Sequence, residues 1–190
     1  MPLEIEIKLK VDTHEPVRRR LREAGAQPKG TVRETNIFFD RPDNSLRKQD
    51  TGLRVRFSQR PGNAPPETLL TAKGPAAVTG LRSREAFDLT LTPHDQIVPL
   101  LKMLGFEKIL LFEKDRESWQ LASCLIELDT LPHFGPFVEI EGPSELAVME
   151  VQQQLHLSDL EPHRPSYSRM VGQYLEREAI TNGELRFAQL

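Results

Sequence analysis

The first residues of the chain combine acids and bases at a spacing that could bind a metal ion together with an anion. The charged residues Glu4, Glu6, Lys8 and Lys10 alternate with the apolar residues Leu3, Ile5, Ile7, Leu9 and Val11. Because successive side chains of a β-strand point to opposite faces, one face of this segment is charged and the other is apolar. Two acids followed by two bases on one face suit a cavity that holds a divalent cation and an anion.

The same alternation of charged and apolar residues recurs in several later segments. The further acids that follow it are Glu127, Asp129, Glu139 and Glu141, and the further bases are Arg54, Arg56, Lys73, Arg82, Arg84, Lys114 and Arg116. A buried charge costs several kcal/mol unless it is paired or binds a metal. The pattern therefore predicts a barrel whose charged side faces inward and whose apolar side is covered by helices. Its acids could hold one or two hard cations, and its bases a phosphate chain.

Two other arrangements would produce the same pattern. Each charged face could be open to water, or each could lie beside a strand of opposite charge. Arg54 with Arg56 and Glu139 with Glu141 are pairs of one sign, and adjacent like charges repel unless an opposite charge lies between them. That opposite charge would be a phosphate for the arginines and a metal for the glutamates, or else a neighbouring strand, which is the main alternative.

The elements that must position these residues are short strands with a few helices. We expect strands at residues 3–11, 31–40, 53–57, 68–73, 81–91, 109–115, 117–121, 124–129 and 137–141. Apolar spacing and capping residues predict helices at 13–24 and 92–104, a third from Ser144 and a fourth from Ser166. This order predicts an α+β fold with an antiparallel barrel or curved sheet and helices outside it. The segment after Thr181 is expected to be loosely held.

The composition limits the classes of protein. The chain has 190 residues, of which 38% are hydrophobic and 28% charged, and this suits one domain. Its 25 basic and 28 acidic residues leave no basic excess that would indicate a nucleic-acid partner. A single cysteine, Cys124, excludes an intrachain disulfide and suits a reducing compartment. Without a membrane-spanning or signal segment, the expected location is the cytoplasm, with no membrane partner.

Several segments together resemble one family. They are Glu4–Lys8, Asn36–Asp40, Leu53–Arg56, Thr71–Gly74, Arg84–Glu85, Glu113–Arg116, Leu128–Asp129, Phe134–Glu141 and Ser166–Tyr167. In this order they resemble the CYTH domain, also called the triphosphate tunnel metalloenzyme superfamily, which includes class IV adenylyl cyclases and thiamine triphosphatase-like proteins. Residues 104–141 and 164–167 look most like the class IV adenylyl cyclase branch.

The resemblance implies one domain over residues 1–180, with a C-terminal tail at 181–190. The domain would be a closed antiparallel β-barrel, a tunnel of about eight strands with helices packed outside. The implied Mg²⁺ or Mn²⁺ ligands are Glu4, Glu6, Asp129, Glu139 and Glu141. The implied phosphate-binding residues are Lys8, Arg54, Arg56, Lys73, Arg84, Lys114 and Arg116. Lys8, Glu6 and Glu141 are the predicted catalytic residues, whereas Lys10 and Arg82 fit the family pattern less clearly.

These implications predict a metal-dependent phosphohydrolase that acts on a small-molecule triphosphate, as a monomer or a homodimer. The substrate would be inorganic triphosphate, thiamine triphosphate or a nucleoside triphosphate. Two alternatives stay open: a class IV adenylyl cyclase that makes cyclic AMP and pyrophosphate, and a non-catalytic binder of polyphosphate or nucleotide. One position departs from the family pattern, because Phe38 stands where many members have a tyrosine that is thought to act with the lysine of the opening motif.

Overall fold

The structure is a computed structural model that describes residues 3–62, 66–75, 82–92 and 95–188, without the side chains of residues 3–4 and 82–83. Its strands are β1 (Leu3–Lys10), β2 (Gln27–Asp40), β3 (Gly52–Gln59), β4 (Glu67–Lys73), β5 (Arg82–Leu91), β6 (Glu107–Leu121), β7 (Cys124–Leu131), β8 (Gly135–Gly142) and β9 (Glu184–Leu185). Its helices are α1 (Glu15–Glu23), α2 (Ser45–Lys48), α3 (Ile97–Met103), α4 (Glu145–Gln154) and α5 (Tyr167–Arg177).

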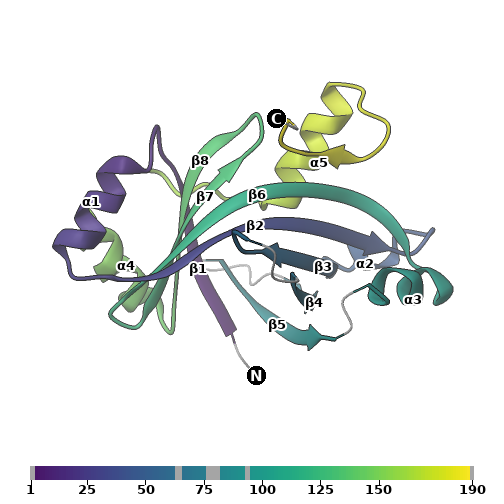
Figure 1. Ribbon diagram of the computed structural model, residues 1–190, viewed down its shortest axis with the longest axis horizontal. Helices are drawn as coiled ribbons and strands as arrows, with labels where there is room; N and C mark the ends of the chain where they lie inside the picture. The colour runs from purple at the N-terminus through teal and green to yellow at the C-terminus, as the bar shows by residue number, and fades with distance from the viewer. Residues whose placement is uncertain (1–2, 63–65, 76–81, 93–94, 189–190) are drawn as a thin grey trace.

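The strands form one curled sheet in the order β2-β3-β4-β5-β1-β8-β7-β6-β9 (Figure 1). The first eight strands in this order pair antiparallel, and β9 pairs parallel with β6. β2 also pairs antiparallel with β6 along most of its length. The α+β class and the antiparallel sheet predicted from the sequence are confirmed.

The apolar face of β1, β8 and β7 lies under α1 and α4. These two helices lie together at the left in Figure 1, at one end of the curled sheet. One buried cluster contains Val17 and Leu21 of α1 and Val148 of α4, together with Leu9 and Ile140 of the strands. Burying such side chains contributes about 1.5–3 kcal/mol each. The apolar residues of the opening segment therefore face outward into this core, which leaves the charged residues on the other face.

The remaining helices cover other parts of the sheet. α3 packs through Ile97 and Leu101 against Phe39 and Val55, on the apolar side of β2 and β3. α5 packs on the opposite, inner side, where its Val171 joins a cluster with strand residues that include Leu110, Phe112, Leu131 and Phe137. Since side chains repeat on one face at every second residue, these strand residues share a face with Lys114, Asp129 and Glu139. α5 thus covers one end of the charged face.

Most expected elements occur, with three corrections. The helix expected at 92–104 begins only at Ile97, after Gln96 as its N-cap residue. Residues 109–115 and 117–121 belong to one strand, β6, because Arg116 continues the pairing with both β2 and β7. The segment after Thr181 is docked, since β9 pairs with β6 and Leu185 is buried in the core beside α5. The two serine caps are confirmed: Ser144 Oγ accepts a hydrogen bond from the amide of Ala147, and Ser166 Oγ accepts one from the amide of Arg169.

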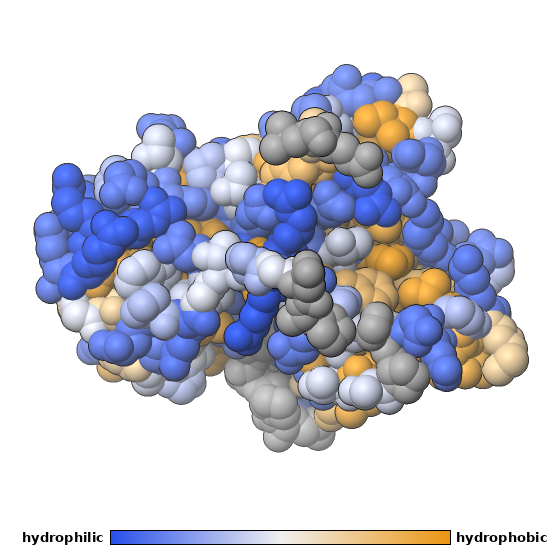
Figure 2. All heavy atoms as spheres, viewed as in Figure 1, coloured by the Kyte–Doolittle hydropathy of each residue, from blue (hydrophilic) through white to orange (hydrophobic). Residues whose placement is uncertain are grey.

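The surface differs between the two ends of the molecule. Hydrophilic residues predominate over α1 at the left of Figure 2, whereas hydrophobic residues gather toward the end that carries α3. There the exposed side chains of Leu100, Met103 and Leu104 contribute to the apolar surface. No helix among the described residues is long and apolar enough to cross a membrane.

Candidate active site

The inner face of the curled sheet gathers charged side chains from strands far apart in the sequence. Each of the following is at most 9% exposed: Lys8, Glu34, Lys114, Arg116, Glu127, Asp129 and Glu139. They come from β1, β2, β6, β7 and β8. Charged side chains are seldom buried to this degree unless they are paired. The arrangement in which every charged face is open to water is therefore wrong for these strands.

Arg116 is the centre of the acidic part of this cluster. Its guanidinium donates hydrogen bonds of 2.7 and 2.6 Å to the two carboxylate oxygens of Asp129, and a bond of 2.7 Å to Glu139. It also forms an ion pair with Glu127. Asp129 lies directly opposite Arg116 on the neighbouring strand, so strand register sets this contact. One guanidinium thus offsets carboxylates of both β7 and β8.

Glu34, which sequence reasoning did not single out, connects the acidic and basic parts. Its carboxylate lies 3.4 Å from Lys114 Nζ and 3.3 Å from an Arg56 guanidinium nitrogen. Burial acts to raise the pKa of Glu34, but the charges of Lys114, Arg116 and Arg56 outweigh it and lower that pKa to about 2. The sequence feature that could have identified Glu34 is its position two residues before Asn36, on the inner face of β2. Neighbouring strands of opposite charge, the alternative left open by the sequence, therefore account for part of the pattern.

The basic part of the site lies on β3 and its neighbours. Arg54 donates a hydrogen bond of 3.1 Å to Thr71 Oγ1, which in turn donates one of 2.5 Å to Asp88. Burial, and next the charge of Arg56, lower the pKa of Arg54 to about 10. The Nε atoms of Arg54 and Arg56 are buried and have no hydrogen-bond partner among the described residues. Buried donors without a partner are uncommon, and an anion placed between the two guanidinium groups would satisfy them.

The acids of β1 and β8 lie opposite one another. Glu6 pairs in register with Glu141, and Lys8 with Glu139. Burial, followed by the negative charge of Glu6, raises the pKa of Glu139. Burial also raises the pKa of Glu127 to about 7, against the opposing charge of Arg116. A divalent cation beside Glu6 and Glu139 would relieve their repulsion, and carboxylate oxygens are the donors that Mg²⁺ and Mn²⁺ prefer.

The predicted metal ligands are only partly brought together. Among the side chains that the structure describes, no group of three or more His, Cys, Asp or Glu residues is arranged to hold a metal ion. Both oxygens of Asp129 are engaged by Lys114 and Arg116. The side chain of Glu4 lies outside the described residues, as does that of Arg82. Glu6 and Glu139 are close enough to influence one another, and their carboxylate oxygens suit a divalent cation. Glu141 lies opposite Glu6 on the neighbouring strand.

The remaining predicted phosphate ligands lie on β4 and β5. Lys73 is two residues from Thr71 and therefore on the same face of β4, and Arg84 lies opposite Glu4 on the inner side. Both side chains are partly buried. Strand alternation thus brings Lys73 and Arg84 to the face that carries Arg54 and the acids of β1.

Lys8 and Lys114 converge on an aromatic side chain of α5. The Lys8 ammonium donates a hydrogen bond to the Pro165 carbonyl and lies 4.3 Å from the ring centroid of Tyr167, and Lys114 Nζ lies 5.1 Å from the same centroid. Phe38 stacks on Phe112, with the ring centroids 5.7 Å apart, so it packs near this end of the site.

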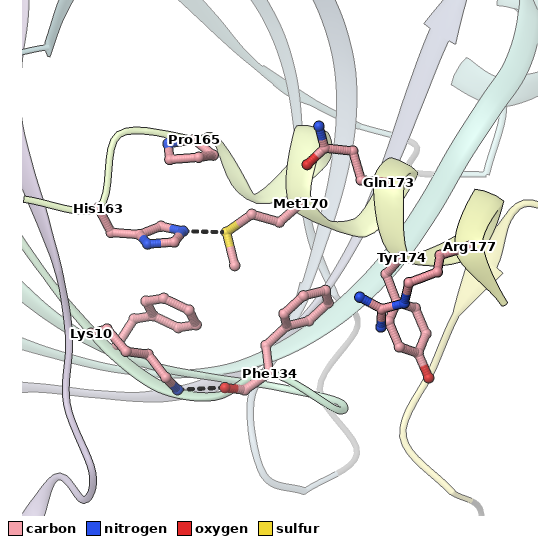
Figure 3. Close-up of a pocket in the computed structure, with 9 residues that line it drawn as sticks. Lys10, Phe134, His163, Pro165, Met170, Gln173, Tyr174 and Arg177 are labelled. Atoms are coloured by element: carbon pink, nitrogen blue, oxygen red, sulfur yellow. Dashed lines mark hydrogen bonds between the residues drawn. The ribbon is translucent and has the colours of Figure 1, made fainter.

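A separate pocket lies on the other side of these residues. It has a volume of about 370 Å³ and lies between α5 and the ends of β1 and β8; Lys10, Phe134, Phe137, His163, Pro165, Met170, Gln173, Tyr174 and Arg177 line it (Figure 3). His163 contacts the Met170 sulfur across it, and Lys10 donates to the Phe134 carbonyl. Phe137 is shared with the charged site through its contact with Tyr167. None of the predicted metal or phosphate ligands lines this pocket.

Comparison with known proteins agrees with this geometry. A protein of Methanocaldococcus jannaschii that is provisionally named an adenylate cyclase is 26% identical over 179 residues, which span 90% of this chain and 99% of that protein. The structure of a Vibrio parahaemolyticus protein, also provisionally named an adenylate cyclase, superposes with a TM-score of 0.78 at 23% identity and covers 90% of this chain and 98% of its own. A Hippeastrum protein, provisionally named an adenylyl cyclase but with a dominant triphosphatase activity, matches with a TM-score of 0.69 at 18% identity over 94% of this chain and 96% of its own.

The family assignment rests on a match along most of the chain. The profile of the CYTH domain matches residues 2–169, which include β1 to β8 and the start of α5. All the predicted phosphate-binding and metal-binding residues fall within this range. This match identifies the chain as a member of the CYTH domain family, in agreement with its curled antiparallel sheet and inward-facing acids and bases.

Proposed function

We propose that this protein is a divalent-metal-dependent phosphohydrolase that binds the triphosphate group of a small molecule inside the curled sheet. The observation that carries the proposal is the pair of neighbouring guanidinium groups of Arg54 and Arg56, whose Nε atoms are buried and have no hydrogen-bond partner among the described residues. Two adjacent cations in a low-dielectric site favour an anion between them. A triphosphate, with several negative oxygens in a row, is large enough to reach from these arginines to Lys114.

We further propose that the sheet acts as a closed tunnel. The pairing of β2 with β6, in addition to the pairings along the sheet, supports this. A closed wall of strands would exclude water from the charged residues, which would strengthen their interactions with phosphate oxygens. The side chains of Lys8, Lys73, Arg84 and Arg116 would complete the set of bases.

The carboxylates of β1 and β8 would hold the metal. Glu6, Glu139 and Glu141 would bind Mg²⁺ or Mn²⁺, with Glu4 and Asp129 as further candidates, and the metal would supply positive charge against phosphate oxygens. Phosphoryl transfer depends mainly on positioning and on stabilisation of charge. Arg54 and Arg56 would fix the phosphate chain, and Lys8 would stabilise charge on it near the metal. Hydrolysis then requires only water as the attacking group.

Adenylyl cyclase activity is the second candidate. The names of the Methanocaldococcus and Vibrio proteins favour it, whereas the triphosphatase activity described for the Hippeastrum protein favours hydrolysis. Cyclisation of ATP additionally needs a shaped nucleoside site that places the ribose 3′-hydroxyl at the α-phosphorus. The charged cluster alone is sufficient for hydrolysis, so we place hydrolysis first.

The test measures the products from inorganic triphosphate, thiamine triphosphate and ATP, with Mg²⁺, with Mn²⁺ and with EDTA. Hydrolysis predicts metal-dependent release of orthophosphate. Cyclisation predicts cyclic AMP and pyrophosphate from ATP, and a binding protein predicts substrate affinity without product.

A matched pair of variants tests the metal site. Glu6→Gln keeps the size of the side chain but removes the charge, and we expect it to abolish turnover while the melting temperature stays near that of the unaltered protein. Glu67→Gln, on the exposed part of β4, should leave turnover unchanged. Full turnover of Glu6→Gln at saturating Mg²⁺ would contradict the metal assignment.

A further inference from the structure

Tyr167 occupies a rigid position at the edge of the charged cluster. It is the first residue of α5, directly after the Ser166 cap, and the preceding carbonyl of Pro165 accepts the Lys8 hydrogen bond. Its ring packs edge-on against Phe112 and Phe137, with centroid distances of 6.5 and 5.4 Å. Both phenylalanines are on the inner face of their strands, each two residues from a charged residue of the site. The phenol is therefore held by packing on several sides.

The ring of Tyr167 also lies close to two predicted phosphate ligands. The ammonium groups of Lys8 and Lys114 lie 4.3 and 5.1 Å from its centroid. Cations at such distances are attracted to the face of an aromatic ring. The two ammonium groups repel one another, and an anion that binds near both would also lie near Tyr167.

Packing accounts for the ring of Tyr167 but not for its hydroxyl group. It is buried, and it makes no hydrogen bond of normal geometry with the described residues. Burial, and next the negative charge of Asp129, raise the pKa of the phenol well above its ordinary value. A phenol is in any case protonated at neutral pH, so this hydroxyl is available as a donor. A phenylalanine would supply the same packing without a buried hydroxyl to satisfy.

We infer that the Tyr167 hydroxyl donates a hydrogen bond to an oxygen of the bound triphosphate and is a further substrate-binding residue of this site. The inference rests on the proposed function, because it assumes the triphosphate beside Lys8 and Lys114. The ammonium groups of Lys8 and Lys114 act as point charges, whereas a phenol fixed at the start of a helix donates in one direction. Tyr167 therefore selects the position of the phosphate chain rather than only its charge.

The test compares Tyr167→Phe with Tyr174→Phe. Tyr174 lies two turns further along the same helix and faces the separate pocket, so it is the matched control. Removal of a hydrogen bond to a charged group lowers kcat/KM by about 10- to 100-fold. We expect this loss for Tyr167→Phe only, together with a smaller rise in melting temperature on addition of inorganic triphosphate. The melting temperature without ligand should change little, because the hydroxyl lies beside Asp129 but makes no hydrogen bond of normal geometry with it.

The outcomes separate this inference from the proposed function. If the unaltered protein binds and hydrolyses triphosphate but Tyr167→Phe does so equally well, the inference is wrong and the proposed function stands. If Tyr167→Phe melts at a lower temperature without ligand and retains its affinity for triphosphate, the hydroxyl supports Asp129 instead, and the inference is again wrong. If the unaltered protein neither binds nor hydrolyses triphosphate, both are overturned.

Discussion

Neutralising Glu34 is the most direct test of the charge network inside the sheet. Glu34→Gln keeps the shape of the side chain but removes the negative charge that lies between Lys114 and Arg56. The pKa of Glu34 falls from an ordinary 4.5 to about 2. At 1.36 kcal/mol per pKa unit this corresponds to about 3 kcal/mol of stability at neutral pH. For a chain of this size the melting temperature should fall by about 6–12 °C.

The pH dependence of this loss has a definite sign. Because the pKa of Glu34 is lower in the folded than in the unfolded protein, its contribution is complete above about pH 5 and is lost as the pH falls toward 2. Urea denaturation of the two proteins should therefore differ by about 3 kcal/mol at pH 7 and by about 1 kcal/mol at pH 3. Glu107→Gln, at an exposed position on β6, is the control and should change little at either pH.

The same variant makes a second, independent prediction. Without Glu34, the positive charges of Lys114, Arg56 and Arg116 are less compensated, so inorganic triphosphate should bind more tightly and restore much of the lost stability. Calorimetric titration and melting curves with added triphosphate measure this. Unchanged stability at pH 7 together with weaker triphosphate binding would refute the reasoning, because it would show that Glu34 does not neutralise these bases.

Two further substitutions test the phosphate ligands and the docked C-terminus. Arg56→Ala should weaken triphosphate binding by about 10- to 100-fold in low salt and by less in 0.5 M salt, as measured by titration. Arg60→Ala, at an exposed position, is the control. An equal loss of affinity at both salt concentrations would contradict a charge contact. Leu185→Ala should lower the free energy of unfolding by about 2–4 kcal/mol, because Leu185 is 3% exposed in the core beside α5. Leu104→Ala, at an exposed position, should change the free energy of unfolding by less than about 0.5 kcal/mol. If both variants lose the same free energy of unfolding in denaturant, Leu185 does not belong to the core.

The sequence alone determined which face of each strand is charged. Alternation along a strand is a local geometric property, so the spacing in Glu4–Lys10 and in Glu139–Glu141 was sufficient to separate the inner from the outer residues. The serine caps of α4 and α5 could be predicted for the same reason, because a cap depends on the residues next to it. These local features, together with the resemblance to the CYTH domain, led to the confirmed family and to the α+β class.

Tertiary structure alone decided which charges meet. Arg116 pairs with Asp129 and Glu139 because β6, β7 and β8 lie side by side in one register, and register depends on contacts distant in the sequence. Glu34 became part of the site through the pairing of β2 with β6. Tyr167 reached the site because α5 packs on the inner face of the sheet. Since the energy of a buried charge depends on its neighbours, strand spacing could indicate where the charges face but not which of them compensate one another.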